Sequence, residues 1–240
     1  MRLNQGNGCS GLTLIECMVI TAVLAILILL LFPAHTGNKL SAKHINCINN
    51  LKEVGLAFRQ WANDHNGKLP TEVSVTNGGA MEAVIAGNVA AVYQVMSNEL
   101  STPKILFCPA DKRKIQAVTF DRTATAKGWN KVTPFLNNSN VSYFVGLDAR
   151  FSTPEMFLSG DDNLLVGGKA NIQYGAFDGV AVKPGVLSLW TNTPAAWSDE
   201  RHGRRGYVCL TDGSVQSFSS GKLAAALRNT GSATNRLAFP

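Results

Sequence analysis

The chain has 240 residues, of which 45% are hydrophobic and 16% are charged, and its formal net charge is +6 at pH 7. About 170 residues follow the N-terminal third, enough to bury one core without support from metals or many disulfides. The densest basic spots, residues 112–114 and 201–205, are short. A solvated surface loop explains each of them better than a polyanion site, so we do not expect nucleic acid as a partner.

Residues 12–32 form an apolar run of 21 residues in which Glu16 is the one charged side chain. As a helix the run would be roughly 31 Å long, close to the thickness of a bilayer core, which predicts a membrane span. Removal as a secretory signal is not expected, because Phe32, Pro33 and Ala34 do not make a small-residue cleavage site. A carboxylate inside such a span is costly without a partner, so Glu16 is the first candidate for a functional residue.

A polar leader, residues 1–11, precedes the run, and Gly11 is followed by Leu-Thr-Leu-Ile-Glu at residues 12–16. This pattern resembles the type IV prepilin family, including the pseudopilins of type II secretion. The resemblance implies that prepilin peptidase cleaves between Gly11 and Leu12, and that Leu12 is then methylated at its new amino terminus. It also implies a helix kink at Pro33.

Glu16 has a physical reason to take part in assembly. Cleavage would give Leu12 a positive amine, and a carboxylate in the first turn also interacts favourably with the helix dipole. In a filament the resemblance implies that Glu16 pairs with the amine of a neighbouring subunit, which would set the axial register. The alternative is a Glu16 that is protonated or reaches the lipid headgroups.

Charge counting does not fix the orientation of the run, because Arg2 lies on one side of it and Lys39 and Lys43 on the other. The resemblance implies a single-pass protein of the bacterial inner membrane, with its C-terminal domain in the periplasm or assembled into a filament. It also implies four kinds of partner: prepilin peptidase, other pilin-like subunits in a homo- or hetero-filament, an inner-membrane assembly platform and membrane lipid.

A helical pattern continues beyond the run. Apolar residues recur at spacings of three and four, and the helix is expected to end before Gly67 and Pro70; the stripe consists of Ile45, Ile48, Leu51, Val54, Phe58 and Trp61. We therefore predict one helix over about 12–65, interrupted or bent near residues 33–37, with a transmembrane half at 12–32 and an outer half at 33–66, followed by a globular domain at 67–240. The predicted fold is α+β and pilin-like: a long N-terminal membrane-spanning spine helix packed on a C-terminal antiparallel β-sheet domain.

Downstream, a second helix is expected over 81–100, weakened by Gly87 and Asn88. Short β-prone runs separated by turn residues predict the antiparallel sheet; they lie at 141–147, 164–167, 185–190 and 207–211. Asp212 and Gly213 join the last of these to 214–218 and predict a hairpin with a type I′ turn. A helix at 222–228 would close the domain.

Two further motifs narrow the resemblance. Residues 47–58 and Cys-Pro-Ala-Asp at 108–111 look like segments of prepilin-like proteins whose C-terminal part carries a His, nine residues, then Asp-Gly. Here His202 precedes Asp212 and Gly213 at that spacing. A structural role explains these residues better than catalysis, because Asp212 suits a turn and His202 suits a hydrogen bond to the backbone.

The cysteines indicate one disulfide. Cys9 would leave with the leader and Cys17 would lie in the membrane, which leaves Cys47, Cys108 and Cys209 in an oxidising space. We favour a bond between Cys47 and Cys108, which would staple the helix to a downstream segment; three buried thiols are the alternative. No metal site is expected, because the sequence has no Cys-x-x-Cys or paired His spacing.

The sequence gives no indication of an enzyme. It has neither a Gly-x-Ser-x-Gly elbow nor a His-Glu-x-x-His pattern. No cofactor is expected, although Asp161 and Asp162 are weak calcium candidates within an oxygen-rich stretch at 159–163. Ordinary turn chemistry explains that stretch equally well.

The expected function is therefore that of a structural pilin-like subunit of a type II secretion pseudopilus or a related type IV filament. It would be processed by prepilin peptidase and would assemble through its N-terminal helix. The alternative is a membrane-anchored binding protein, a DNA-uptake pilin-like adhesin or surface protein, that uses only the prepilin export signal. In that case the basic loop at 201–205 would contact phosphate.

Overall fold

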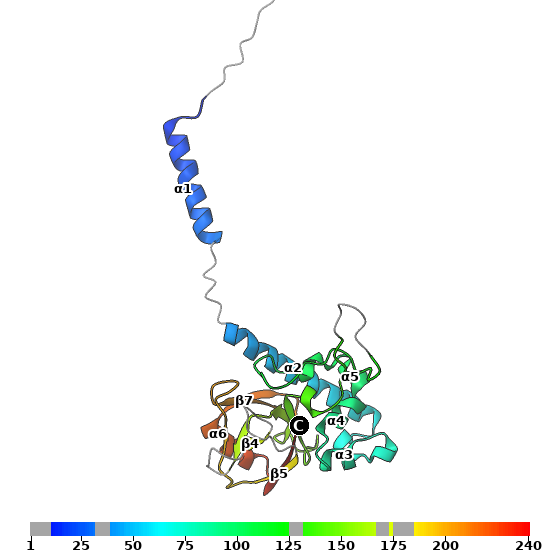
Figure 1. Cartoon of the computed structure of the whole chain (residues 1–240). Coiled ribbons are helices and arrows are strands. Elements are labelled where there is room, and N and C mark those ends of the chain that lie inside the picture. Colours follow the sequence, from blue (N-terminus) through cyan, green and yellow to red (C-terminus); the bar gives the residue numbers. More distant parts are fainter. Residues whose placement is uncertain (1–10, 32–38, 125–131, 167–172, 175–184) are drawn as a thin grey trace, which may run out of the picture. The chain divides into compact units, whose positions relative to one another are not determined.

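The computed structural model describes residues 11–31, 39–124, 132–166, 173–174 and 185–240 (Figure 1). For residues 29–31, 39–41 and 173–174 the description covers the backbone alone. The chain divides into two compact units, Met1–Lys39 and Leu40–Pro240. Each unit is described by itself below.

The N-terminal unit contains one helix, α1 (Leu14–Leu31). Its start is set by reciprocal hydrogen bonds in a Thr-x-x-Glu capping box. Glu16 Oε2 accepts from the Thr13 backbone N–H at 2.7 Å and from the Thr13 hydroxyl at 2.8 Å, and Thr13 Oγ1 accepts from the Glu16 N–H at 3.4 Å. Glu16 therefore has a local partner within its own first turn.

The predicted membrane-spanning spine helix is wrong. α1 has 18 residues, and a separate helix, α2, begins at Lys39. No helix in the described part of the chain is long and apolar enough to cross a membrane. The capping box starts α1 two residues later than expected, and α1 ends at Leu31, before Pro33. This finding overturns both the membrane-spanning element of the fold class and the predicted single-pass location in the inner membrane; the predicted kink at Pro33 lies outside the described residues.

In the globular unit, α2 (Lys39–Asp64) carries the apolar stripe expected from the sequence. One face of the helix is buried in the domain core, with Cys47, Leu51, Val54, Phe58 and Trp61 each no more than 2% exposed. The helix ends where Asn66 and Gly67 take positive φ values of 56° and 76°, and the Gly67 N–H donates to Ala62 O at 2.8 Å. This is the glycine stop that the sequence predicts.

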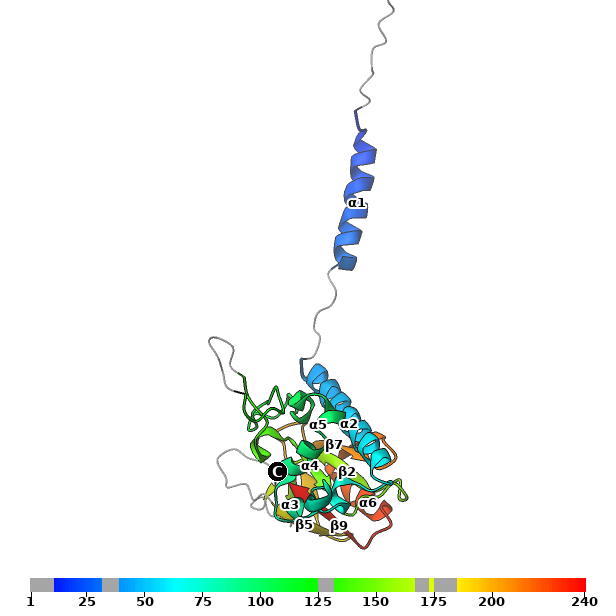
Figure 2. The ribbon, with the colours of Figure 1, turned by 90° about the vertical axis from the view of Figure 1, so that its right-hand side faces the viewer.

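α2 packs on a six-stranded antiparallel sheet in the order β5-β9-β1-β2-β7-β8 (Figure 2). The strands are β1 (Tyr143–Gly146), β2 (Phe157–Asp161), β5 (Gly185–Trp190), β7 (Arg205–Leu210), β8 (Val215–Ser219) and β9 (Thr234–Phe239). Alternate residues of β7 enter different cores: Tyr207 and Cys209 pack in the core that contains α2, and Val208 and Leu210 in the second core. The sheet is thus apolar on both faces.

The second core lies under α6 (Ser220–Asn229), which buries Leu223 and Leu227. A small antiparallel sheet in the order β4-β3-β6 adds to this side; its strands are β3 (Leu164–Val166), β4 (Gln173–Tyr174) and β6 (Ala195–Trp197). Trp197 contributes the largest buried side chain of this core.

The predicted helix at 81–100 is broken into three short helices, α3 (Met81–Ile85), α4 (Val89–Val95) and α5 (Ser97–Leu100). Gly87 takes a φ of 88°, and the Asn88 side chain caps α4 by accepting from the Ala91 N–H at 3.3 Å. Four 3-10 turns complete the unit: η1 (Pro70–Glu72), η2 (Val75–Asn77), η3 (Pro103–Leu106) and η4 (Asn138–Asn140). The first of the two breaks thus lies at the two residues that weaken the helical pattern, and the second lies at Met96.

The predicted type I′ turn is also wrong, although the hairpin between β7 and β8 is present. Gly213 has a φ of 90°, but Asp212 is not among the described non-glycine residues with positive φ. The strands are instead joined by a four-residue loop at 211–214, in which Asp212 Oδ1 accepts from the Ser214 N–H at 2.7 Å. This Asx turn holds the loop without a left-handed Asp212.

The approach of α2 to the sheet depends on Gly55. A Cβ atom placed on Gly55 would lie 2.6 Å from Cys209 Sγ on β7, well inside van der Waals contact. The helix and the strand therefore meet at a point where a side chain on the helix has no room.

We expect Gly55→Ala to lower the free energy of unfolding by about 1–3 kcal/mol, the usual cost of overpacking, despite the better helix propensity of Ala. Cys209→Ala would remove the clashing sulfur, so Gly55→Ala should cost less in that background. Urea unfolding of the four chains of this double-mutant cycle measures the coupling. The matched control is Gly221→Ala in α6, where nothing lies within 4 Å of the added Cβ. Equal costs of Gly55→Ala in both backgrounds would contradict the close contact.

Candidate functional site

A disulfide between Cys47 and Cys108 joins α2 to the segment that follows η3, with a Cα–Cα distance of 5.2 Å. This is the pairing favoured from the sequence. The bond closes a loop with a sequence separation of 61, and such a crosslink contributes about 4 kcal/mol on the chain-entropy model. A neighbouring hydrogen bond from Asn50 Nδ2 to Phe107 O, at 3.0 Å, ties the same two segments.

The Cys-Pro-Ala-Asp motif is a tight turn that carries Asp111 into the interior. The Asp111 N–H donates to Cys108 O at 2.8 Å, and Asp111 is 4% exposed. Its carboxylate accepts from Arg113 Nε at 2.9 Å, and Arg113 also donates to Asp162 Oδ1 at 2.8 Å. The turn after the disulfide is thereby linked to the end of β2.

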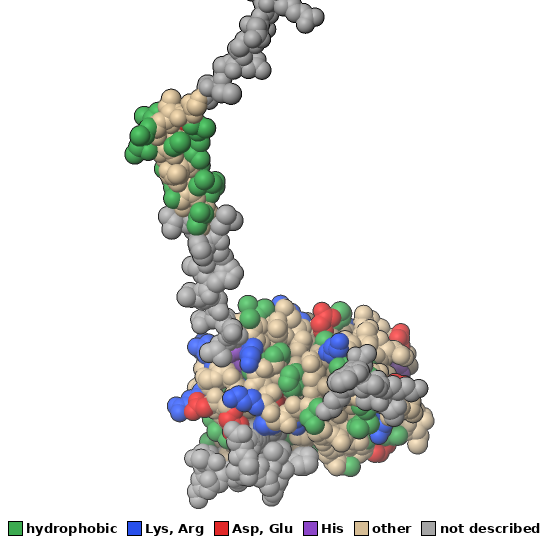
Figure 3. All heavy atoms as spheres, turned by 45° about the horizontal axis from the view of Figure 1, so that its top comes forward, with side chains coloured by type: hydrophobic (Ala, Val, Ile, Leu, Met, Phe, Trp, Pro, Cys, Tyr) green, Lys and Arg blue, Asp and Glu red, His purple; other side chains and the backbone are tan. Residues whose placement is uncertain are grey.

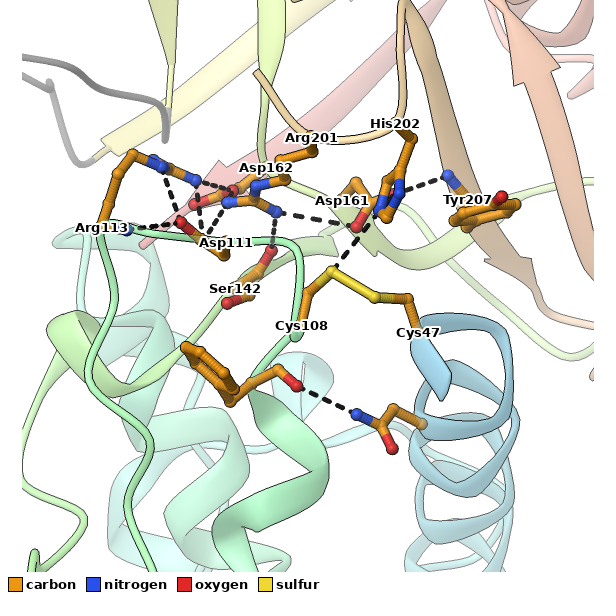
Figure 4. Close-up of a disulfide and its surroundings, with 12 residues drawn as sticks. Cys47, Cys108, Asp111, Arg113, Ser142, Asp161, Asp162, Arg201, His202 and Tyr207 are labelled. Carbon is orange, nitrogen blue, oxygen red and sulfur yellow. Dashed lines mark hydrogen bonds and ion pairs between the residues drawn. A yellow bond between two sulfur atoms is a disulfide. The ribbon is translucent and has the colours of Figure 1, made fainter. Parts of the chain in front are cut away.

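Arg201 lies at the centre of this arrangement (Figure 4). Its side chain is 1% exposed and forms short ion pairs with Asp111 and Asp162. Arg201 Nη1 also donates to Ser142 O at 2.9 Å and lies 3.6 Å from Asp161 Oδ1. One guanidinium therefore connects the 108–111 turn, the start of β1, the end of β2 and the loop before β7.

We call this group the Arg201 cluster; its members are Asp111, Arg113, Lys114, Asp161, Asp162 and Arg201. Three carboxylates face three cations, so the formal charges balance. Burial raises the pKa of Asp162 well above its usual value, whereas the positive charges of Arg113 and Lys114 act in the opposite direction. Breaking such a buried network at one member leaves the others without compensation.

His202 joins the Arg201 cluster to the disulfide. Its Nε2 atom lies 3.4 Å from Cys108 Sγ and 3.4 Å from Asp161 Oδ2. Asp161 Oδ2 also accepts from the Tyr207 backbone N–H at 2.8 Å. The His202 ring packs edge-on against Tyr207 and against His44 of α2, with centroid distances of 4.7 and 4.8 Å. The imidazole is thus enclosed on several sides.

The structure changes how the His and Asp-Gly motif is interpreted. Asp212 and Gly213 lie exposed in the β7–β8 loop, where Gly213 supplies the positive φ. The carboxylate beside His202 is instead Asp161, which the sequence brought forward only as a weak calcium candidate. His202 and the Asp212-Gly213 pair therefore have separate structural roles, one beside Asp161 and the other in the β7–β8 loop.

The two calcium candidates are buried among cations. Asp161 and Asp162 are both 0% exposed, and their carboxylates face Arg201 and Arg113. A calcium ion needs several oxygen ligands at once and would have to displace these arginines, which makes the stretch a poor calcium site. The remaining predicted site residues, Gly11, Leu12 and Glu16, belong to the N-terminal unit.

Sequence analysis missed the central role of Arg201. The basic stretch at 201–205 was interpreted as a solvated loop, which describes Arg204, 74% exposed at its side chain, but not Arg201. The sequence did contain a pointer to Arg201: it directly precedes His202, which begins the His and Asp-Gly motif, and its partner Asp111 ends the Cys-Pro-Ala-Asp motif. Spacing alone could not show that these motifs meet.

Comparisons of the chain with protein-family models, with curated proteins and with solved structures found no match. What the site can do must therefore be judged from its own chemistry. The described residues of the Arg201 cluster form a buried, charge-balanced network of ion pairs beside the disulfide, and the His202 imidazole lies against Cys108 Sγ.

Replacing Arg201 by Met is expected to lower the free energy of unfolding by about 3–5 kcal/mol, because it leaves buried carboxylates without their cation. Thermal or urea unfolding measures this loss. Arg204→Met is the matched control, since Arg204 pairs at 2.8 Å with an equally exposed Asp199 and should matter little. If the two variants were equally stable, the ion pairs of the Arg201 cluster would not stabilise the folded domain.

The free thiols should differ in reactivity. Burial raises the pKa of Cys209 to about 12, so iodoacetamide at pH 8 should modify exposed Cys17 and spare Cys209 until the chain is unfolded, as peptide mass mapping would show. Because this pKa is raised, its contribution to stability is complete below the unfolded-state pKa and is lost as pH rises from about 9 towards 12. Cys209→Ala should flatten that alkaline decline; rapid alkylation of Cys209 in the folded chain would contradict its burial.

Proposed function

We propose that the chain is a structural subunit of a type II secretion pseudopilus or a related type IV filament. Prepilin peptidase would cleave after Gly11, Leu12 would be methylated, and subunits would assemble through α1. The observation that carries the proposal is that an apolar helix follows the cleavage motif with its described side chains exposed. Figure 3 displays these hydrophobic side chains around α1.

The exposure of α1 needs an explanation beyond the single chain. Leu14 is 79% exposed, Ile15 70% and Met18 63%. Contiguous exposed apolar surface of this kind is typical of interaction sites, and a filament would bury it between subunits. The globular unit, in contrast, has two filled cores of its own. This contrast supports assembly through the N-terminal helix.

The residues around the cleavage motif are compatible with processing. Gly11 and Leu12 are exposed and precede the first turn of α1, so the backbone there is not tied into a helix. A Cβ on Gly11 would meet nothing within 4 Å in the chain itself. A requirement for glycine would therefore come from the peptidase and not from folding.

The alternative, a binding protein that contacts phosphate through residues 201–205, gains no specific support. Arg201 is buried in ion pairs with Asp111 and Asp162, and Arg204 is paired with Asp199. Cations that already have carboxylate partners offer little to a phosphate backbone. The filament role is therefore the better proposal.

The decisive variants are at Glu16 and Gly11. Glu16→Gln retains a side chain that can complete the capping box but removes the charge that would pair with a neighbouring amine. We expect this variant to be processed, with methylated Leu12 seen by mass spectrometry of the mature N-terminus, but not to form filaments in electron micrographs. Gly11→Val should block processing itself.

Glu16→Asp, which keeps the charge, is the matched control and should retain part of the assembly. Normal filaments from Glu16→Gln would refute the assembly role of the charge, and an unprocessed wild-type chain would refute the whole proposal.

A further inference from the structure

The disulfide is surrounded by groups that are themselves good metal ligands. The sulfurs of Cys47 and Cys108 and a ring nitrogen of His202 all lie within 4.8 Å of one another. Asp161 Oδ2 lies 3.4 Å from His202 Nε2 but outside this group of three mutually close atoms, so it could serve as a fourth donor only after moving towards the sulfurs. All four residues are buried, and they come from α2, the 108–111 turn, the end of β2 and the loop before β7 (Figure 4).

Two of the separations between these donors are close to those of a tetrahedral zinc site, and the two sulfurs, bonded to each other here, would have to separate on reduction. Zn–S bonds of about 2.3 Å and Zn–N or Zn–O bonds of about 2.1 Å place sulfur and nitrogen ligands about 3.6 Å apart and nitrogen and oxygen ligands about 3.4 Å apart. Here Cys108 Sγ and His202 Nε2 are 3.4 Å apart, as are His202 Nε2 and Asp161 Oδ2. We propose that the chain with Cys47 and Cys108 reduced binds one Zn²⁺ through these two sulfurs, His202 Nε2 and Asp161 Oδ2.

The electrostatic surroundings suit such an ion. Two thiolates and one carboxylate around Zn²⁺ leave one negative charge, and Arg201 Nη1 lies 3.6 Å from Asp161 Oδ1 to compensate it. The Tyr207 N–H fixes Oδ2 at 2.8 Å, which is the kind of outer support that orients metal ligands.

The disulfide and the metal would be alternative states of one sulfur pair. A dithiol reductant transfers two electrons and two protons to the disulfide, breaks its S–S bond, gives the two thiols and becomes a disulfide itself. Zn²⁺ then binds and displaces the two thiol protons. A disulfide oxidant accepts two electrons from the thiolates and two protons from the solvent, becomes a dithiol, and leaves the re-formed S–S bond of Cys47 and Cys108, which releases Zn²⁺. The α2 helix would thus stay attached to the 108–111 turn in reducing and oxidising surroundings alike.

His44 is half-buried on α2 and packs edge-on against His202, with ring centroids 4.8 Å apart, so its side chain covers one side of the imidazole. The inference does not rest on the filament role, since it uses the globular unit alone.

The test uses the full-length chain reduced with a phosphine under anaerobic conditions and titrated with Co²⁺ as a spectroscopic substitute for Zn²⁺. We expect one equivalent to give a thiolate-to-cobalt charge-transfer band and the strong d–d bands of a tetrahedral site, both abolished by Zn²⁺. The oxidised chain should give neither. His202→Ala should weaken binding by at least about 100-fold, more than loss of an outer partner costs.

Controls separate this site from other histidines and thiols. His65→Ala and Cys209→Ser should bind as the wild type does, because His65 stacks on Trp61 and Cys209 lies outside the donor set. A test on the wild-type chain does not depend on variants that fold poorly: Zn²⁺ should protect Cys47 and Cys108 of the reduced chain from alkylation and leave Cys17 reactive. Absence of charge transfer, unchanged binding by folded His202→Ala, or no protection by Zn²⁺ would overturn the proposal.

Discussion

The burial of one guanidinium among three carboxylates is the constraint on which the globular unit depends. Arg201 reaches Asp111, Asp161 and Asp162 from a loop that would otherwise lie at the surface. A buried charge is tolerated only where its partners are held in place, so the 108–111 turn and the end of β2 must both be correctly positioned before this group is satisfied. The loop before β7 can therefore take its native position only once the 108–111 turn and the end of β2 are in place.

The disulfide and the Arg201 cluster restrict the same segment in different ways. The bond between Cys47 and Cys108 limits the unfolded chain, whereas Asp111, three residues after Cys108, is held only in the folded state. His202 lies between them, 3.4 Å from both Cys108 Sγ and Asp161 Oδ2. Reduction of the disulfide would therefore release Cys47 of α2 from Cys108, whereas the ion pairs of Asp111 would still hold the 108–111 turn.

Local patterns in the sequence predicted most elements of the globular unit, and long-range contacts account for what it missed. The stripe on α2, the glycine stop at Gly67 and several strands follow from periodicity and turn residues. The strands β2, β4, β6 and β9 were missed. Of these, β9 pairs with β1 and β5, which are distant from it in sequence, so its burial depends on long-range contacts. The membrane-spanning helix was wrong because hydropathy marks an apolar run, whereas the capping box at Thr13 and Glu16 sets where the helix begins. At the candidate site, the sequence favoured a backbone hydrogen bond for His202, and only the fold brings Asp161 beside it.

The capping box also sharpens what assembly would require of Glu16. Its carboxylate already accepts two hydrogen bonds from Thr13 in the single chain, at 2.7 and 2.8 Å. A neighbouring amine must compete with these bonds, and in water an exposed ion pair gains too little to do so. The balance changes where packed apolar helices exclude water, because the attraction between the charges rises as the effective dielectric constant falls. Under the proposed function, pairing at Glu16 would therefore follow the packing of α1 helices, and the charge would select the register of an interface that apolar contacts create.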